Sequence, residues 1–126
     1  AMKKVLSTPK APPALGPYSQ ADVSGGFVFA SGQLGMTSEG KLEASDVAGQ
    51  TQQVLANIKA VLAEAGLDFS DVVKSTCFLM DMNDFPEFNK VYGEHFSEPY
   101  PARSTFQVAA LPGGGLVEIE VIAKVR

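Results

Sequence analysis

The last quarter of the chain, from Tyr100 to Arg126, reads YPARSTFQVAALPGGGLVEIEVIAKVR and is the most informative part of the sequence. Two strand-like runs flank a Pro-Gly-Gly-Gly turn, a pattern that favours a hairpin. Arg103 lies at the start of the first run, and Glu118 lies in the second. A turn that brings the two runs side by side would place a cation next to a carboxylate. The starting hypothesis is that Arg103 and Glu118 carry the chemistry and that the rest of the chain positions them.

The second run predicts a strand with one apolar side, because alternate residues of a strand face opposite sides of a sheet. That side consists of Val117, Ile119, Val121, Ala123 and Val125. Glu118 and Glu120 share the other side, and their apolar neighbours indicate that at least one carboxylate is partly buried. Such a carboxylate needs a partner, and an arginine on an adjacent strand is a natural one. The alternatives are a solvated edge strand and, for Arg103, a surface arginine or a structural ion pair.

Upstream of this stretch, strand patterns and helix patterns alternate. Apolar residues recur at helical spacing between Ser45, a good N-cap, and Gly66, a good residue to end a helix. A second helix is expected to begin at Asn83 or Asp84 and to end near Phe96. Strand patterns precede and separate the helices over residues 3–8, 18–23, 27–33 and 72–82.

The resulting order, β-β-β-α-β-α-β-β, predicts an α+β fold with a mixed six-stranded sheet in a single domain over residues 1–126. Right-handed crossovers would place both helices on one face of the sheet. The opposite face is too apolar to remain bare, so we expect a homo-oligomer that covers it. Ala1 precedes Met2, which we take as the natural start.

Composition limits the classes of function. The 126 residues carry a net charge of -4 and the pI is about 4.9, so no nucleic-acid partner is expected. There is one cysteine, which excludes an intrachain disulfide, and no apolar run reaches the length of a membrane span. No signal peptide is visible. We expect a cytoplasmic protein, or an organellar one if a transit peptide has been removed.

Several other conspicuous residues have ordinary interpretations. Cys77, in a predicted central strand, is expected to be a packed, inert thiol. His95, the single histidine, is expected to contact carbonyls at a helix end, and no metal site is predicted. No Lys-Ser/Thr follows Gly113–Gly115, so these glycines indicate a turn rather than a phosphate loop. Tyr18 either packs or directs its hydroxyl into a cleft, and Asn89 is a surface amide or a pocket residue.

Five motifs, in this order, resemble those of one known family. They are Gly16-Pro17-Tyr18-Ser19-Gln20, Ala30-Ser31-Gly32-Gln33, Asn83-Asp84-Phe85 with Asn89, Pro101-Ala102-Arg103-Ser104 and Val117-Glu118-Ile119-Glu120. Together they cover nearly the whole chain. On these motifs the chain is similar to the RidA group of the Rid (YjgF-type) family, the reactive intermediate imine/enamine deaminases.

The resemblance implies a chorismate-mutase-like fold and a homotrimer with three equal sites in the clefts between subunits. The implied reaction is the hydrolysis of 2-imino acids or their enamine tautomers, such as 2-aminoacrylate and 2-aminocrotonate, to 2-oxo acids and ammonia. These substrates leak from pyridoxal-phosphate enzymes. The resemblance implies that the deaminase itself uses no cofactor and no metal.

The resemblance also implies a role for individual residues. Arg103 would hold the substrate carboxylate, and Glu118 would orient the attacking water. The pocket would be lined by Tyr18, Ser31, the Gly32 backbone N–H, Asn89 and Thr105. Thr105 stands where the family often has cysteine. A hydroxyl group in place of a thiol is expected to change the substrate preference. We expect the pocket beside Arg103 to be completed by a neighbouring subunit's Tyr18 or Asn89 segment.

Two other functions are compatible with the motifs. The first is a non-enzymatic trimer that binds small carboxylates, but this chain keeps both Arg103 and Glu118, which favours the enzyme. The second is an endoribonuclease or translation inhibitor, an activity attributed to some relatives. An acidic chain without basic clusters is a poor candidate for it.

Overall fold

The computed structural model describes residues 3–126, so Ala1 and the expected start at Met2 lie outside the described residues. Its strands are β1 (Lys4–Leu6), β2 (Ala21–Ser24), β3 (Phe27–Ala30), β4 (Gln33–Leu34), β5 (Val72–Leu79), β6 (Ala102–Gln107) and β7 (Val117–Lys124). The α-helices are α1 (Val47–Ala63) and α2 (Phe85–His95), and short 3-10 turns occupy Phe69–Asp71, Met82–Asp84 and Pro112–Gly114.

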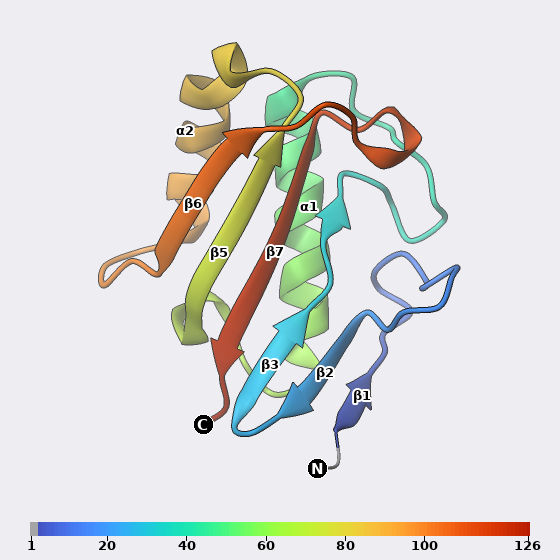
Figure 1. The fold of residues 1–126 in the computed structure, drawn as a ribbon, viewed down its shortest axis with the longest axis vertical. Helices are drawn as coiled ribbons and strands as arrows, with labels where there is room; N and C mark the ends of the chain where they lie inside the picture. The colour runs from blue at the N-terminus through green and yellow to red at the C-terminus, as the bar shows by residue number, and fades with distance from the viewer. Residues whose placement is uncertain (1–2) are drawn as a thin grey trace.

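The strands form one mixed sheet with both helices on one face (Figure 1), which confirms the α+β prediction. The order is β1-β2-β3-β7-β5-β6, with β4 also paired to β7. Among the strands of residues 3–126, β5 and β6 are the one parallel pair, and the other pairs are antiparallel. The sheet has seven strands rather than the expected six. The predicted strand over residues 27–33 breaks at Ser31-Gly32, and its end becomes β4.

The predicted hairpin between the two final runs is wrong, because β5 lies between β6 and β7. The chain passes from β5 through α2 into β6, and this crossover places β6 parallel to β5 on its outer side. The segment that follows crosses the end of β5. There the Val108 N–H donates to the Leu79 carbonyl (2.9 Å), and the Met80 N–H donates to the Leu116 carbonyl (3.1 Å). The segment with the Pro-Gly-Gly-Gly turn therefore crosses over β5 to connect β6 with β7, instead of joining two neighbouring strands.

Helix α1 begins one residue later than its capping signal suggested. Asp46, rather than Ser45, is the N-cap, and its carboxylate accepts a hydrogen bond from the Gly49 N–H at 2.9 Å. At the other end, Gly66 takes a φ of +70°, which glycine adopts without strain. The Leu67 N–H then donates back to the Leu62 carbonyl at 3.0 Å, which ends the helix as expected.

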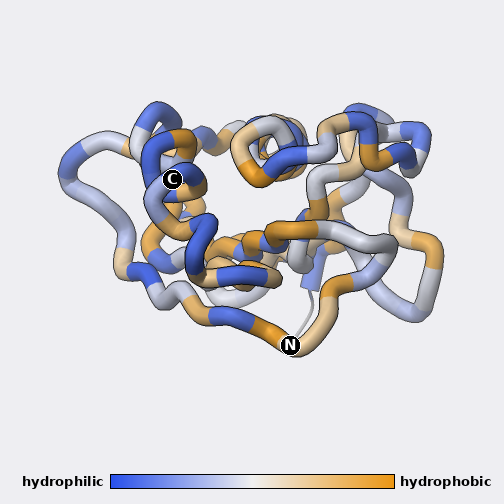
Figure 2. Tube along the Cα trace, turned by 90° about the horizontal axis from the view of Figure 1, so that it is seen from above, coloured by the Kyte–Doolittle hydropathy of each residue, from blue (hydrophilic) through white to orange (hydrophobic). Residues whose placement is uncertain are grey.

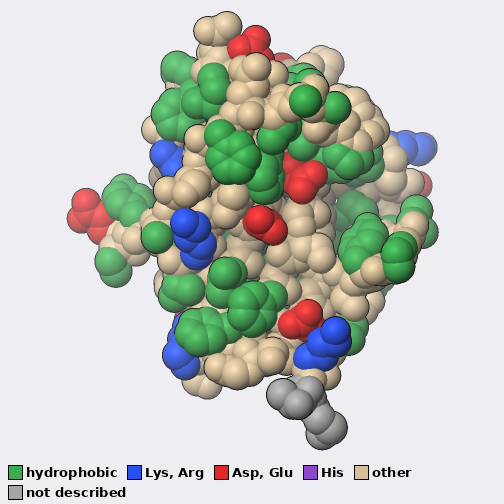
Figure 3. All heavy atoms as spheres, viewed as in Figure 1, with side chains coloured by type: hydrophobic (Ala, Val, Ile, Leu, Met, Phe, Trp, Pro, Cys, Tyr) green, Lys and Arg blue, Asp and Glu red, His purple; other side chains and the backbone are tan. Residues whose placement is uncertain are grey.

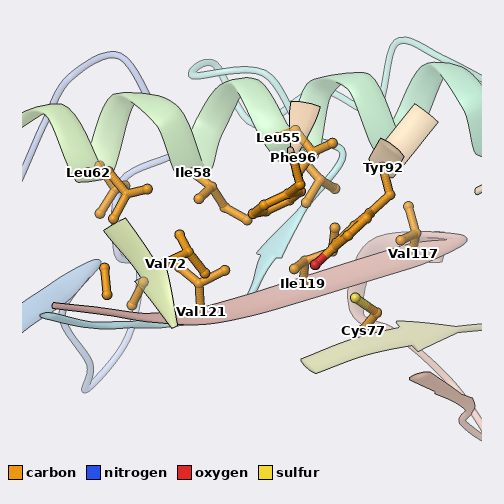
Figure 4. Packing of buried hydrophobic residues seen from close by; sticks show 14 of the residues in the cluster. Leu55, Ile58, Leu62, Val72, Cys77, Tyr92, Phe96, Val117, Ile119 and Val121 are labelled. Atoms are coloured by element: carbon orange, nitrogen blue, oxygen red, sulfur yellow. The ribbon is translucent and has the colours of Figure 1, made fainter. Parts of the chain in front are cut away.

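The core lies between the helix layer and the sheet. Viewed along the length of the molecule, α1 appears end-on above the strands (Figure 2), and Figure 4 shows Leu55, Ile58 and Leu62 of α1 above the strands. These three side chains are fully buried, and each contributes about 1.5–3 kcal/mol of transfer free energy. The predicted apolar side of β7 faces them; its buried members are Val117, Ile119, Val121 and Ala123. Within residues 3–126, neither α-helix has the length and apolar character needed to span a bilayer.

A buried amide on α1 holds the loop that contains β4. The Asn57 side chain is fully buried, and its Nδ2 donates to the carbonyls of Leu34 (3.2 Å) and Met36 (2.8 Å). Because a buried carbonyl without a donor is costly, this amide fixes where β4 joins the edge of β7.

Replacement of this amide should loosen the loop. Asn57→Leu keeps the branching and the number of side-chain heavy atoms but leaves two carbonyls without their donor, so we expect the free energy of unfolding to fall by about 1–3 kcal/mol. Urea unfolding measures the change. Gln52→Leu, at an exposed position of the same helix, is the control and should change stability by less than about 0.5 kcal/mol. Equal stabilities of Asn57→Leu and the original chain would contradict the assignment.

Candidate functional site

Arg103 lies on β6 and is held by one face of α2. Its Nη1 donates to Asn89 Oδ1 at 2.7 Å. The guanidinium carbon lies 4.7 Å from the centre of the Tyr92 ring and 5.5 Å from that of Phe85, within cation–π range of both. Within residues 3–126, no carboxylate pairs with Arg103; the salt bridges join Arg126 to two aspartates. The guanidinium is thus fixed in place while its charge is left free for a ligand.

A hollow opens beside this guanidinium. Its volume is about 450 Å³, and it is lined by Asn89, Tyr92, Gly93, Tyr100, Pro101 and Arg103. Arginine presents several N–H donors in a plane, and Asn89 occupies only one of them. The geometry suits a small molecule with a planar anionic group such as a carboxylate.

Thr105 follows Arg103 by two residues and therefore shares its face of the sheet. Its Oγ1 is buried and has no hydrogen-bond partner among residues 3–126. It lies opposite Cys77 in the register of β5 and β6. Cys77 is fully buried, and burial raises the pKa of its thiol, so the packed thiol was predicted correctly. His95 contacts the Val91 carbonyl through Nδ1 at 3.0 Å, also as predicted.

Glu118 belongs to a second cluster, around β4 and β7. Gly32 lies so close to it that a Cβ there would collide with the Glu118 carboxylate in its present position, so any larger residue would displace that side chain. The Ser31 hydroxyl donates to the Ser19 carbonyl at 2.6 Å and so fixes the segment that carries Tyr18. Tyr18 and Gly32 line one hollow of about 210 Å³. The exposed Tyr18 ring is free to contact a second molecule.

The Glu118 carboxylate is half-buried, as its apolar neighbours suggested. Burial raises the pKa of this carboxyl group above its ordinary value, and the charge of Glu120 raises it further. The predicted arginine partner on an adjacent strand is absent among the described residues. A carboxylate with a raised pKa is a stronger base than an ordinary one and can accept a proton from water more readily.

The two clusters lie on opposite faces of the sheet. Arg103 is in register with Ser75, whose side chain is buried under α2. Glu118 is in register with Phe78, three residues along β5 and therefore on the other face. Figure 3 shows this open face, where acidic side chains lie near the centre among hydrophobic ones. Arg103 and Glu118 of one chain therefore cannot reach the same small molecule.

The structure thus divides the seven predicted site residues into two groups. Arg103 and Thr105 of β6 lie on the side of the sheet that α2 covers, together with Asn89 of that helix, and the others lie around β4; these are Tyr18, Ser31, Gly32 and Glu118. The expectation that Asn89 is supplied to Arg103 by a neighbouring subunit is wrong, because the two side chains of one chain are hydrogen-bonded. The expectation for Tyr18 is untested and remains a prediction.

Two residues of the Arg103 cluster were missed in the sequence. The apolar character of Phe85 and Tyr92 indicated only packing, and neither was predicted to contact Arg103. With Asn89 they stand at positions i, i+4 and i+7, which is one face of a helix. Since Asn89 was already a candidate, that spacing was the signal that identifies its two aromatic neighbours. Within residues 3–126, no group of three or more histidine, cysteine or acidic side chains is arranged to hold a metal ion.

Comparisons with known proteins agree on one family. The family model described as Endoribonuclease L-PSP matches residues 8–125. A 2-iminobutanoate/2-iminopropanoate deaminase from Bos taurus is 50% identical over 97% of this chain and 90% of its own length. The crystal structure of RidA from an Antarctic Psychrobacter is 47% identical, with a TM-score of 0.93 over 97% of this chain and 99% of the other. E. coli TdcF, solved with bound serine, is 43% identical, with a TM-score of 0.89 over 96% and 98% of the two chains.

The raised pKa of Glu118 predicts a pH-dependent change in stability. Burial in the folded chain disfavours the ionised Glu118 carboxylate. The stability of the folded chain is therefore greatest below the pKa that this group has in the unfolded chain, and it falls as the pH rises through the higher pKa of the folded chain. Glu118→Gln should therefore be more resistant to urea than the original chain at neutral pH. The difference should vanish below the ordinary carboxyl pKa of 4.5. Glu120→Gln, at the exposed neighbouring position, should show a smaller gain. A Glu118→Gln variant that is less stable at neutral pH would contradict the assignment.

Proposed function

Because the chain belongs to the Endoribonuclease L-PSP family, which includes the Rid proteins, we infer that it is a hydrolytic deaminase of 2-imino acids. Its products are a 2-oxo acid and ammonia. The observation that carries this inference is the Arg103 guanidinium, which is fixed by Asn89 and two aromatic rings and has no carboxylate partner among residues 3–126. Such a group suits the planar carboxylate that every 2-imino acid carries.

In the proposed reaction, Arg103 binds the substrate carboxylate and holds C2 in the cleft. Glu118 accepts a proton from a water molecule whose oxygen forms a bond to C2. Addition of water to the protonated imine gives a carbinolamine, and Glu118 returns its proton to the amine nitrogen of this intermediate. The C–N bond then breaks and ammonia leaves, while the remaining hydroxyl proton passes to Glu118 or to solvent as the oxygen becomes the carbonyl of the 2-oxo acid. Positioning of the water and one proton acceptor supply most of what this reaction needs, because a protonated imine carbon is already electrophilic.

The remaining site residues have supporting roles in this proposal. Tyr18, Ser31 and the Gly32 backbone line the cleft on the Glu118 side, and Asn89 lines it on the Arg103 side. The Thr105 hydroxyl, buried without a partner in the described chain, is available to the substrate where many relatives have a thiol. Serine bound to E. coli TdcF supports a site of this size and charge, because serine is a small molecule with a carboxylate.

We further propose that each complete site forms between two copies of the chain in a homotrimer. The separation of Arg103 and Glu118 on opposite faces supports it, since one chain alone cannot bring both residues to one substrate molecule. The open face also carries exposed apolar side chains that a partner would cover; these are Val5, Phe29 and Phe106. A closed ring of three places the Arg103 side of each chain against the Glu118 side of the next.

Ribonuclease activity, which the family description suggests, has less support. A protein that binds RNA presents basic side chains along the backbone path, whereas this chain has a net charge of -4. The similarity to named imine deaminases over nearly the whole chain favours deamination of small molecules.

The direct test generates 2-iminobutanoate in solution from an amino acid with an oxidase and follows its loss in the presence of the protein. We expect acceleration over the spontaneous rate and a loss of at least about 100-fold in kcat/KM for Arg103→Ala, in line with removal of a charged substrate anchor. Arg103→Lys keeps the charge without the planar set of N–H donors, so its kcat/KM should lie between those of the original chain and of Arg103→Ala. A rate equal to the spontaneous one with the original chain would defeat the proposal.

A mixing experiment tests the shared site. Arg103→Ala and Glu118→Gln should each be inactive as pure proteins. After unfolding and refolding as an equal mixture, about a quarter of the sites in a cyclic trimer receive both original residues, so about a quarter of the original activity should return. A mixture that stays inactive while forming trimers, as judged by light scattering, would place the site within one chain.

A further inference from the structure

We propose that Tyr92 is a positioning residue for the substrate anchor. Its ring, fixed in the core, supports the Arg103 guanidinium so that the remaining N–H donors point into the cleft. The inference rests on the proposed function, since it concerns the carboxylate that Arg103 binds. Nothing in the sequence motifs assigns a role to Tyr92 beyond the apolar side of α2.

The Tyr92 ring is held from three directions. It stacks on Phe96, with ring centres 4.3 Å apart and planes 20° apart, and its other neighbour on the helix is Phe88 at 5.8 Å. Its hydroxyl forms a buried hydrogen bond of 2.7 Å with the Ser75 hydroxyl on β5. Figure 4 shows the ring extending from α2 toward the sheet, with its oxygen at the sheet end. The residue is only 5% exposed, so the ring is packed on most of its surface where it contacts Arg103.

A ring held in this way has a direct effect on the guanidinium above it. The face of an aromatic ring is negative, so it attracts the cation and replaces water on that side. Asn89 fixes one Nη1 hydrogen, and Phe85 supports the same cation from further away. Neither ring carries a full negative charge, so the cation is stabilised without being neutralised. A carboxylate partner would give stronger support but would compete with the substrate for the same donors.

The support predicts a specific loss when the ring is removed. Tyr92→Leu should weaken binding of the product-like anion 2-oxobutanoate by about 3- to 30-fold, the range for a cation–π contact that is partly shielded from water. The binding of its uncharged amide should change by less than about twofold, because the amide does not rely on the cation. In turnover, KM should rise by a similar factor while kcat is kept, as for the loss of an interaction made equally in ground and transition states.

Tyr92→Phe is the matched control. It keeps the ring under Arg103 but removes the hydrogen bond to Ser75, so it should lower the unfolding midpoint while anion binding stays within about twofold of the original. Phe85→Leu is a second variant at a half-buried position, and it tests the same idea if Tyr92→Leu fails to fold. Because its ring lies further from Arg103, its effect should have the same direction and a smaller size.

Calorimetric titration of each variant with 2-oxobutanoate and with the amide decides the matter. A selective loss of anion binding in Tyr92→Leu or Phe85→Leu, with Tyr92→Phe unaffected, supports the proposal. Equal losses of anion and amide, or a Tyr92→Phe loss as large as that of Tyr92→Leu, would overturn it in favour of a structural role. If the unmutated protein binds no 2-oxobutanoate, the proposed function is contradicted. Failure of the proposed function can therefore be distinguished from failure of the role proposed for Tyr92.

Discussion

Side chains alternate across the two faces of a sheet, and β5 decides which face the residues of its neighbours occupy. Arg103 on β6 is in register with Ser75, and Glu118 on β7 is in register with Phe78. Three residues along a strand is an odd step, so the two charged groups point in opposite directions. No side-chain rotation brings them together through a hydrogen-bonded sheet. The proposed function therefore requires assembly, because each face would have to meet a second molecule before both groups could act on one ligand.

Each half of the proposed site depends on a different helix. Under β6, Asn89 and Tyr92 of α2 fix Arg103 by one hydrogen bond and one ring contact. On the other side, α1 supplies two buried amides: Asn57 holds the carbonyls around β4, and Gln50 accepts a hydrogen bond from the Leu116 N–H just before β7. Sites built on helices and strands are held more firmly than those on loops. The helices on one face of the sheet thus position residues on both faces. Helix α2 contacts Arg103 directly, whereas α1 holds β4 and the start of β7, the strands around Glu118.

The sequence predicted those features that depend on local periodicity. The apolar side of β7, the extent of α1 and the half-burial of Glu118 all follow from the spacing of residues a few positions apart. The insertion of β5 between β6 and β7 has no local signal, since a Pro-Gly-Gly-Gly turn is compatible with neighbouring strands or with a step over one strand. The same limit explains the misplaced Asn89. Which residue meets Arg103 depends on how α2 crosses the sheet, and that is set by packing across the whole core.

The charge of the chain imposes a further condition on the proposed reaction. With a net charge of -4, the long-range field does not attract an anionic substrate, so binding depends on a local cation that no acidic side chain neutralises. The aromatic support of Arg103 meets this condition. In the proposed complex, the substrate carboxylate would lie against Arg103, and the protonated imine carbon would lie toward Glu118. The positive charge on that imine would favour the ionised form of Glu118 and offset part of the rise in pKa that burial and Glu120 cause. Glu118 would then be ionised, and able to accept a proton from water, while the substrate is bound.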